Sequence, residues 1–205
     1  MYHFKYVPRT KYLPLKKEII ELIKEVQNQV RDKFTFQFEF VGSTKRNMIT
    51  EDARSNIGFD FDVNLTVNND KNYTPKEIRT ILRTAITNVS RKYGYNRCED
   101  STRVITTVKT STKNSSILHS CDFAIVKGNR YIRFDNKENV YVWASQPKDF
   151  INLDKKAKEL RKDSEKWKVG KEKYLKKKNE NNDPNKHSRS LYAETINEFY
   201  DKFYH

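Results

Sequence analysis

The chain has 205 residues and a net charge of +14, a length that fits one domain or one domain with a small helical appendage. This surplus favours polyanionic partners such as nucleic acid or nucleotide phosphates, although a solvated lysine face explains it equally well. No run approaches the roughly 18 apolar residues of a membrane span, and residues 1–20 show no signal-peptide pattern. The chain has two cysteines, Cys98 and Cys121, and they lack the spacing of a zinc site. We therefore expect a cytoplasmic protein with unpaired thiols and no membrane association.

The first half of the chain alternates between helical and strand patterns. Apolar residues recur every three or four positions over residues 15–31, which predicts an amphipathic helix that starts just after Pro14. Phenylalanine occupies every second position from Phe34 to Phe40, and this alternation predicts a half-buried strand over residues 34–41. Residues 59–67 alternate in the same way and predict a second strand.

A helix and several strands follow. Thr74, Pro75 and Glu77 form a capping-box pattern that predicts a helix start, and Gly94 marks its end. Strands are expected over 103–110 and 116–126, and the sequences RYIRF and VYVWAS that come next predict a hairpin. The order indicates an α/β (α+β) fold, with a twisted mixed β-sheet flanked by helices and followed by C-terminal helices.

The composition changes near residue 154, so we expect a domain of residues 1–150 and a basic C-terminal helical extension of residues 151–205. Residues 155–178 hold twelve Lys or Arg against four acids, and Gly170 is the expected break in this helical stretch. Trp167 within it fits contact with an acidic polymer as well as docking of the helix. A polar linker and a closing helix with apolar residues follow.

Two acids interrupt the second predicted strand. Asp60 and Asp62 are two residues apart, so their side chains point to the same face, about 6.5–7 Å apart along the backbone. If that face were core, both would be buried charges, which is costly; if it faced solvent, they would carry no particular meaning. The third interpretation is a divalent cation site, because Mg²⁺ and Mn²⁺ prefer hard oxygen ligands.

A third acid, Asp122, lies in an otherwise apolar strand, on the face of Ser120 and Ala124. If this strand lies beside the strand of Asp60 and Asp62, three carboxylates cluster, and two cations about 3.5–4 Å apart would neutralise them and favour in-line displacement at phosphorus. The alternative is an ion pair with a nearby Lys or Arg, for which Arg103 is an obvious candidate.

A Gly-Ser pair ends the strand before these acids. Gly42 lets the backbone approach a ligand closely, and Ser43 offers a hydroxyl and an N–H group to phosphate oxygens. Lys45 and Arg46 add positive charge. The sequence contains no GxxxxGK[ST] motif, so this is not a Walker loop.

These motifs together resemble the nucleotidyltransferase superfamily with the DNA polymerase β-like fold, and in particular its small members. The family pattern is an apolar strand ending in Gly-Ser, a loop, an Asp-x-Asp strand and a later strand with a third acid. The corresponding segments of this chain are FEFVGS, GFDFDVNL and SCDFAIV, and the resemblance covers roughly residues 34–126.

The resemblance implies a catalytic domain over residues 1–150 that uses two Mg²⁺ or Mn²⁺ ions. Asp60 and Asp62 would hold both ions, and Asp122 would bind the second ion and help activate the acceptor. Gly42 and Ser43 would hold the β- and γ-phosphates. The phosphate-binding set that we expect is Gly42, Ser43, Lys45, Arg46 and Arg103.

The implied reaction transfers a nucleoside monophosphate from an NTP, with ATP as the favoured donor, to a hydroxyl acceptor with release of pyrophosphate. The charge favours RNA or another nucleotide as the acceptor. Sixteen residues separate Ser43 from Asp60, which is longer than usual for the family, and Phe59 replaces a small or polar residue. Both departures leave the subfamily open.

About 55 residues follow the predicted hairpin, so the acceptor site would be small or completed by a partner protein or a second copy of the chain. Two other function classes stay open. A glycosyltransferase uses Asp-x-Asp to hold a nucleotide-sugar through Mn²⁺, but it gives no reason for Gly-Ser at a strand end. A non-catalytic RNA-binding module accounts for the charge but leaves Asp122 unexplained.

Overall fold

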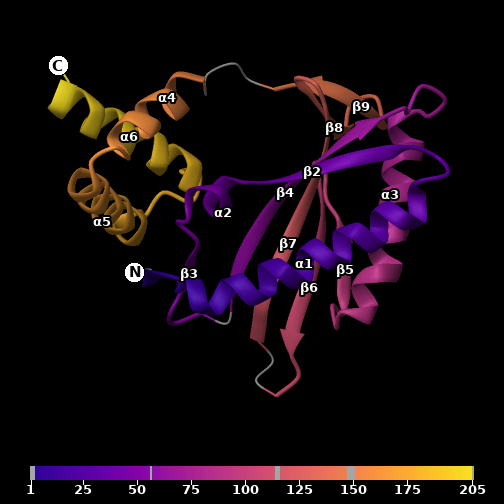
Figure 1. Ribbon diagram of the computed structural model, residues 1–205, viewed down its shortest axis with the longest axis horizontal. Coiled ribbons are helices and arrows are strands. Elements are labelled where there is room, and N and C mark those ends of the chain that lie inside the picture. Colours follow the sequence, from indigo (N-terminus) through magenta and orange to yellow (C-terminus); the bar gives the residue numbers. More distant parts are fainter. Residues whose placement is uncertain (1–2, 56, 114–115, 147–150, 205) are drawn as a thin grey trace. The chain divides into compact units, whose positions relative to one another are not determined.

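The computed structural model describes residues 3–55, 57–113, 116–146 and 151–204 (Figure 1). Within this part of the chain, no helix combines the length and apolar character that crossing a bilayer requires.

The chain forms two compact units. The sheet unit comprises residues 6–51 and 55–146, and the C-terminal unit comprises residues 1–5, 52–54 and 147–205.

Strand pairing in the sheet unit gives the mixed sheet that the sequence predicts. Five strands lie in the order β2-β4-β7-β6-β5, and β8 pairs with both β7 and β9. Strands β4 and β7 are parallel, whereas the other pairs of this sheet are antiparallel. Strands β1 and β3 form a separate two-stranded sheet. The strands are β1 (Phe4–Tyr6), β2 (Thr35–Val41), β3 (Thr50–Asp52), β4 (Phe59–Asn68), β5 (Arg97–Asp100), β6 (Val104–Ser111), β7 (Ser116–Lys127), β8 (Arg130–Asp135) and β9 (Val140–Ser145).

The helices are α1 (Arg9–Val30), α2 (Gly42–Arg46), α3 (Pro75–Lys92), α4 (Ile151–Leu160), α5 (Ser164–Glu180) and α6 (Ser188–Tyr204). The predicted capping box of α3 is confirmed, because the Thr74 side chain accepts a hydrogen bond from Glu77 N and the Glu77 side chain accepts one from Thr74 N. Gly94 follows this helix with φ +76°, which glycine adopts without a steric penalty.

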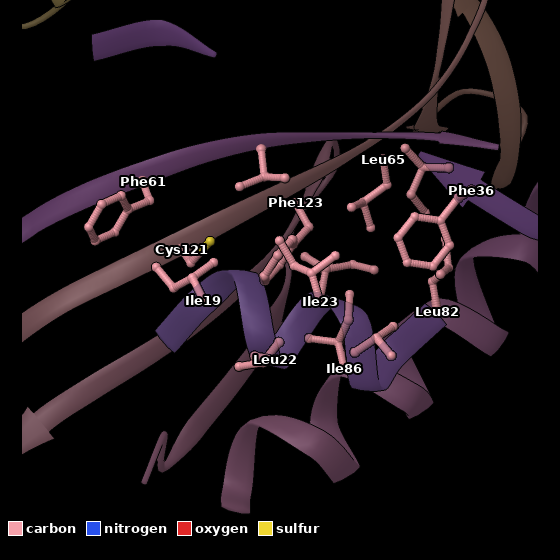
Figure 2. Close-up of a cluster of buried hydrophobic side chains, with 14 of the residues drawn as sticks. Ile19, Leu22, Ile23, Phe36, Phe61, Leu65, Leu82, Ile86, Cys121 and Phe123 are labelled. Atoms are coloured by element: carbon pink, nitrogen blue, oxygen red, sulfur yellow. The ribbon is translucent and has the colours of Figure 1, made fainter. Parts of the chain in front are cut away.

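Helices α1 and α3 pack on one face of the sheet and form the main core with it (Figures 1 and 2). Burying each large apolar side chain stabilises the fold by about 1.5–3 kcal/mol. The core residues labelled in Figure 2 come from both helices and from three strands: Ile19, Leu22, Ile23, Phe36, Phe61, Leu65, Leu82, Ile86, Cys121 and Phe123. The alternating pattern of β4 therefore sends its phenylalanines to the core and its acids to the opposite face.

The predicted start of the first helix was wrong. Helix α1 begins at Arg9, directly after Pro8, and Pro14 lies inside it. The early turn is held by Tyr12, which is 3% exposed and donates a hydrogen bond from its hydroxyl to Asn47 Oδ1 at 3.1 Å. These contacts with the rest of the sheet unit outweigh the local cost of a proline in the helix.

The predicted break at Gly170 was also wrong. Gly170 lies within α5 and is buried, whereas the break falls between α4 and α5. Asp163 caps α5, because its side chain accepts hydrogen bonds from the N–H groups of Glu165 and Lys166. A glycine in a helix costs only about 1 kcal/mol relative to alanine, which packing offsets here.

Helices α4, α5 and α6 supply most of the C-terminal unit. Each contributes buried side chains: Leu153, Ala157, Leu160, Tyr174, Leu191, Tyr192, Ile196 and Phe199. The closing helix that the sequence predicts is thus present as α6, and it packs through its apolar side.

Candidate functional site

The acids of β4 and β7 lie on the sheet face opposite to α1 and α3. In the parallel register of these strands, Asp62 stands beside Asp122 and Asp60 stands beside Ser120. The intervening residues Phe61 and Cys121 point to the core and are fully buried. The expectation that the Asp122 strand adjoins the Asp60–Asp62 strand is therefore confirmed.

The three carboxylates act on one another electrostatically. Burial, followed by the negative charges of Asp60 and Asp122, raises the pKa of Asp62 to about 7, while the positive charge of Arg46 opposes this shift. A carboxyl group with such a pKa is only partly ionised at neutral pH. A cation at this position would favour its ionised form, which is the behaviour expected of a metal-binding carboxylate.

Asp122 has a second neighbour that the sequence analysis missed. Thr106 stands opposite it on β6 and donates a hydrogen bond from its hydroxyl to Asp122 Oδ1 at 2.6 Å. Burial raises the pKa of Asp122, the Thr106 hydrogen bond lowers it, and the charges of Asp60 and Glu99 raise it further. The only sequence signal for Thr106 is its place in an alternating strand, because the β6–β7 register cannot be read locally.

Gly42 lies against the same acids, at the end of β2. Val41, the last residue of β2, pairs with Asp62, and Gly42 has φ +58°. A Cβ atom at this position would lie 2.2 Å from Asp62 Oδ2. Only glycine therefore allows the backbone to approach the Asp62 carboxylate this closely.

Gly42 and the residues after it form the short helix α2 rather than an open turn. Ser43 uses its carbonyl oxygen to accept a hydrogen bond from Met48 N at 2.9 Å. Lys45 pairs with Glu39 on β2 at the surface. Arg46 lies near enough to Asp62 for its charge to lower the pKa of that carboxyl group. Arg46 is thus the cation of this segment that the structure brings to the acids.

Arg103 lies away from the carboxylates. Thr106, three residues later, is the residue opposite Asp122, and three residues span about 10 Å along a strand. The Arg103 guanidinium instead lies 5.8 Å from the centre of the Tyr131 ring. Over the part of the chain that the structure describes, Asp122 makes no ion pair, so the alternative of an Asp122–Arg103 ion pair is wrong.

His119, which lies three residues before Asp122 on β7, belongs to the core face. It is 1% exposed, and its Nε2 lies 3.0 Å from the hydroxyl of Tyr95. Burial, together with the charge of Lys109, lowers the pKa of His119 to about 4. His119 is therefore a neutral core residue that does not reach the carboxylate face.

Among the described residues, no three His, Cys, Asp or Glu side chains are arranged as a ready metal-binding group. Carboxylates of like charge repel one another, which favours rotamers that hold them apart. The donor set nevertheless fits a divalent cation, because Asp60, Asp62 and Asp122 are hard oxygen donors on one face of neighbouring strands.

Comparison with solved structures identifies proteins of the same architecture. Vibrio cholerae DncV with bound 3'-deoxy ATP superposes with a TM-score of 0.60 at 13% identity, covering 98% of this chain and 54% of DncV. Another DncV structure is described as a cyclic AMP-GMP synthase in complex with a linear intermediate. CdnC of E. coli MS115-1 with ATP gives a TM-score of 0.53 at 13% identity, covering 95% of this chain and 63% of CdnC.

The chain thus spans about half the length of DncV. No protein-family model matches the sequence, and no curated protein matches it. The neighbours are nucleotidyltransferase-fold proteins, so the likeness in fold agrees with the motifs that the sequence carries. The chain has the nucleotidyltransferase fold, in a mixed sheet flanked by helices.

Proposed function

We propose that the chain is a metal-dependent nucleotidyltransferase that transfers a nucleoside monophosphate from an NTP to a hydroxyl acceptor. The observation that carries the proposal is the β4–β7 register, which sets Asp62 beside Asp122 with Asp60 on the same face. Nucleotide-bound neighbours support an NTP as the donor, since DncV is solved with 3'-deoxy ATP and with GTP, and CdnC with ATP. ATP is the donor that we favour, and RNA or another nucleotide is the favoured acceptor.

The donor would lie over the carboxylates and beside the end of β2. Gly42 exposes its backbone there without a side chain, and its neighbour Ser43 adds a hydroxyl and an N–H group for phosphate oxygens. The positive charge of Arg46 near Asp62 would complement the triphosphate. These groups would orient the donor so that its α-phosphorus faces the acceptor, and such positioning is the main contribution of a protein to phosphoryl transfer.

Asp122 would act on the acceptor. Its Oδ1 is held by the hydroxyl of Thr106, which fixes the carboxylate plane and leaves Oδ2 for the acceptor hydroxyl. As the acceptor oxygen bonds to the α-phosphorus, its proton passes to Asp122 Oδ2 or to solvent. The bond between the α-phosphorus and the bridging oxygen breaks, and pyrophosphate leaves with the electron pair.

Two Mg²⁺ or Mn²⁺ ions are the cofactors that we propose, with Asp60 and Asp62 holding both and Asp122 holding the second. When bound, such ions polarise phosphoryl oxygens and neutralise the charge that develops on the leaving group. The acids of this face then have a clear purpose, because their mutual repulsion would otherwise only weaken the fold.

Pyrophosphate release tests the proposal. The purified chain is incubated with Mg²⁺ or Mn²⁺ and each of the four NTPs, with and without a short RNA as acceptor. We expect release with at least one NTP, and a loss of about 100-fold or more in Asp62→Asn and in Asp122→Asn, the scale on which removing one transition-state contact acts.

A matched control is Asp135→Asn. Asp135 lies on β8 and pairs with Arg133, away from the carboxylates of β4. This variant should release pyrophosphate like the unmodified chain. Release that is equal in all three variants, or absent with every NTP, metal and acceptor tested, would contradict the proposal. Transfer from a UDP-sugar without pyrophosphate release would favour the glycosyltransferase alternative.

A further inference from the structure

The lysines of the C-terminal unit fall into two groups. Those that face α6 are neutralised by its acids: Lys173 pairs with Glu198 at 2.7 Å, and Lys177 pairs with the same Glu198 and with Glu194. Lys186 pairs with Glu194 at 2.7 Å. These cations hold the helices together and do not offer free charge to a partner.

A second group lies along α4 and the residue after its end. Lys155, Lys158 and Arg161 are exposed and are three residues apart, and Arg161 N still donates to Ala157 O in the helical pattern. Residues three apart are neighbours on a helix surface. Within the ranges that the structure describes, none of the three makes an ion pair. They form a row of uncompensated positive charge.

An aromatic ring continues this row. The guanidinium of Arg161 lies 4.6 Å from the centre of the Trp167 ring, and Trp167 is half-buried. The arrangement places a flat ring and a delocalised cation next to the charges of α4. We define Lys155, Lys158, Arg161 and Trp167 as the α4 patch.

The chemistry of the α4 patch favours one class of polyanion. The apolar side of α4 is already used inside the C-terminal unit, where Leu153, Ala157 and Leu160 are buried. The helix therefore has no free apolar face with which to enter a lipid surface. Phosphate groups pair with lysines, and unpaired bases stack on an aromatic ring or on arginine, so single-stranded nucleic acid matches both parts of the patch.

We propose that the α4 patch binds single-stranded nucleic acid through phosphate contacts at Lys155, Lys158 and Arg161 and base stacking at Trp167. A duplex satisfies the cations but keeps its bases stacked on one another, so it binds less tightly than a single strand. This inference is independent of the nucleotidyltransferase proposal, because it concerns binding in the absence of NTP and metal.

The test compares two triple variants of the full chain that carry the same change in net charge. The patch variant is Lys155→Gln, Lys158→Gln and Arg161→Gln, and the matched control is Lys173→Gln, Lys177→Gln and Lys186→Gln. Fluorescence anisotropy with labelled 20-nucleotide RNA and DNA strands, a duplex and anionic vesicles measures affinity at several salt concentrations. Circular dichroism melting verifies that both variants stay folded.

We expect the patch variant to lose about 10-fold or more in affinity for a single strand. The slope of the logarithm of its binding constant against the logarithm of the salt concentration should become shallower by about 2, since each lost phosphate contact removes about 0.7 from this slope. The control keeps both values near those of the unmodified chain. Equal losses in the two variants would show that only the net charge matters and would overturn the proposal, as would tighter binding to vesicles or to the duplex than to single strands.

Trp167 supplies a second, independent readout. Trp167→Leu should weaken single-strand binding about 10-fold, because it removes the stacking surface, whereas Trp167→Phe keeps a ring and restores most of the affinity. Asp135→Asn, a charge change on β8 outside the α4 patch, should bind as the unmodified chain does. If Trp167→Phe and Trp167→Leu bind alike, the stacking part of the proposal is wrong.

Discussion

The two faces of the sheet at β4 and β7 place ionisable groups in contrasting surroundings. On the face covered by α1 and α3, burial lowers the pKa of His119 to about 4 and keeps it neutral. On the opposite face, burial and neighbouring acids raise the pKa of Asp62 to about 7. The core face holds no charged group at these positions, whereas the other face holds acids of like charge whose repulsion disfavours folding. We infer that these acids are retained for function, because they cost stability.

The largest expected difference in stability is between variants of two neighbouring residues of β4, Phe61 and Asp62. Phe61 is fully buried and packs edge-on against Phe40 and Phe59. Phe61→Ala should lower the free energy of unfolding by about 3–5 kcal/mol, because it removes a large core side chain and leaves a cavity. Urea denaturation followed by circular dichroism measures this change.

Asp62→Asn is the matched variant on the other face. It removes one of the mutually repelling acids, so at pH 7 and without divalent metal it should be as stable as the unmodified chain or more stable. A loss as large as that of Phe61→Ala would show that the carboxylate face is packed core.

The pH dependence of stability should have opposite signs on the two faces. The pKa of His119 is lowered in the folded state, so its contribution is complete above about pH 6.5 and is lost as the pH falls toward 4. The pKa of Asp62 is raised, so its contribution grows as the pH falls from about 7 to 3.8. The effects are on the order of 3 kcal/mol for His119 and 4 kcal/mol for Asp62, and the two partly cancel.

Single variants separate the two contributions. His119→Gln should gain stability relative to the unmodified chain as the pH falls from 7 to 4, and Asp62→Asn should lose it. Tyr95, whose hydroxyl lies 3.0 Å from His119 Nε2, has a pKa raised by burial and stays neutral over this range. Denaturation in EDTA at several pH values checks the signs, and parallel curves for all three proteins would contradict the assignment.

Two glycines with nearly the same positive φ allow the effect of backbone strain to be separated from the effect of a steric clash with a neighbour. Gly42 has φ +58° and Gly128 has φ +56°, but only at Gly42 would a Cβ meet a neighbour, Asp62 Oδ2 at 2.2 Å, whereas nothing lies within 4 Å at Gly128. Gly128→Ala should cost about 1 kcal/mol from backbone strain alone and leave NTP turnover unchanged. Gly42→Ala should cost more and abolish turnover. Similar turnover in the two variants would rule out a role for the Gly42 contact.

The smallest expected effect is at Thr106. Thr106→Val removes the hydroxyl that holds Asp122 Oδ1. It should change stability by about 1 kcal/mol or less and lower kcat about 10-fold with little change in KM for the NTP. Thr106→Ser keeps the hydroxyl and should restore kcat. If Ser and Val behave alike, the hydrogen bond does not position Asp122 for the reaction.

Local patterns were enough to predict several elements. Each of these signals lies within a few consecutive residues: the period of two in β2 and β4, the capping box at Thr74, and the hairpin of β8 and β9. The same alternation placed Asp60 and Asp62 on one face. Strong local signals of this kind survive in the fold because tertiary packing agrees with them.

Long-range pairing is what the sequence could not reveal. Nothing near Asp122 or Thr106 reports that β7 lies between β4 and β6 with these residues in register. Strand β5 was not predicted, because its four residues are too few for a periodic signal. The break between α4 and α5 depends on the side-chain cap at Asp163 rather than on Gly170.

The central claim is that the carboxylates shared by β4 and β7 hold divalent cations together with an NTP. Electron paramagnetic resonance of Mn²⁺ titrated into the chain with a non-hydrolysable ATP analogue tests it most directly. We expect about two bound Mn²⁺ per chain, falling to about one in Asp122→Asn. No bound Mn²⁺ beyond that held by the nucleotide alone, or binding that Asp122→Asn leaves unchanged, would contradict the account.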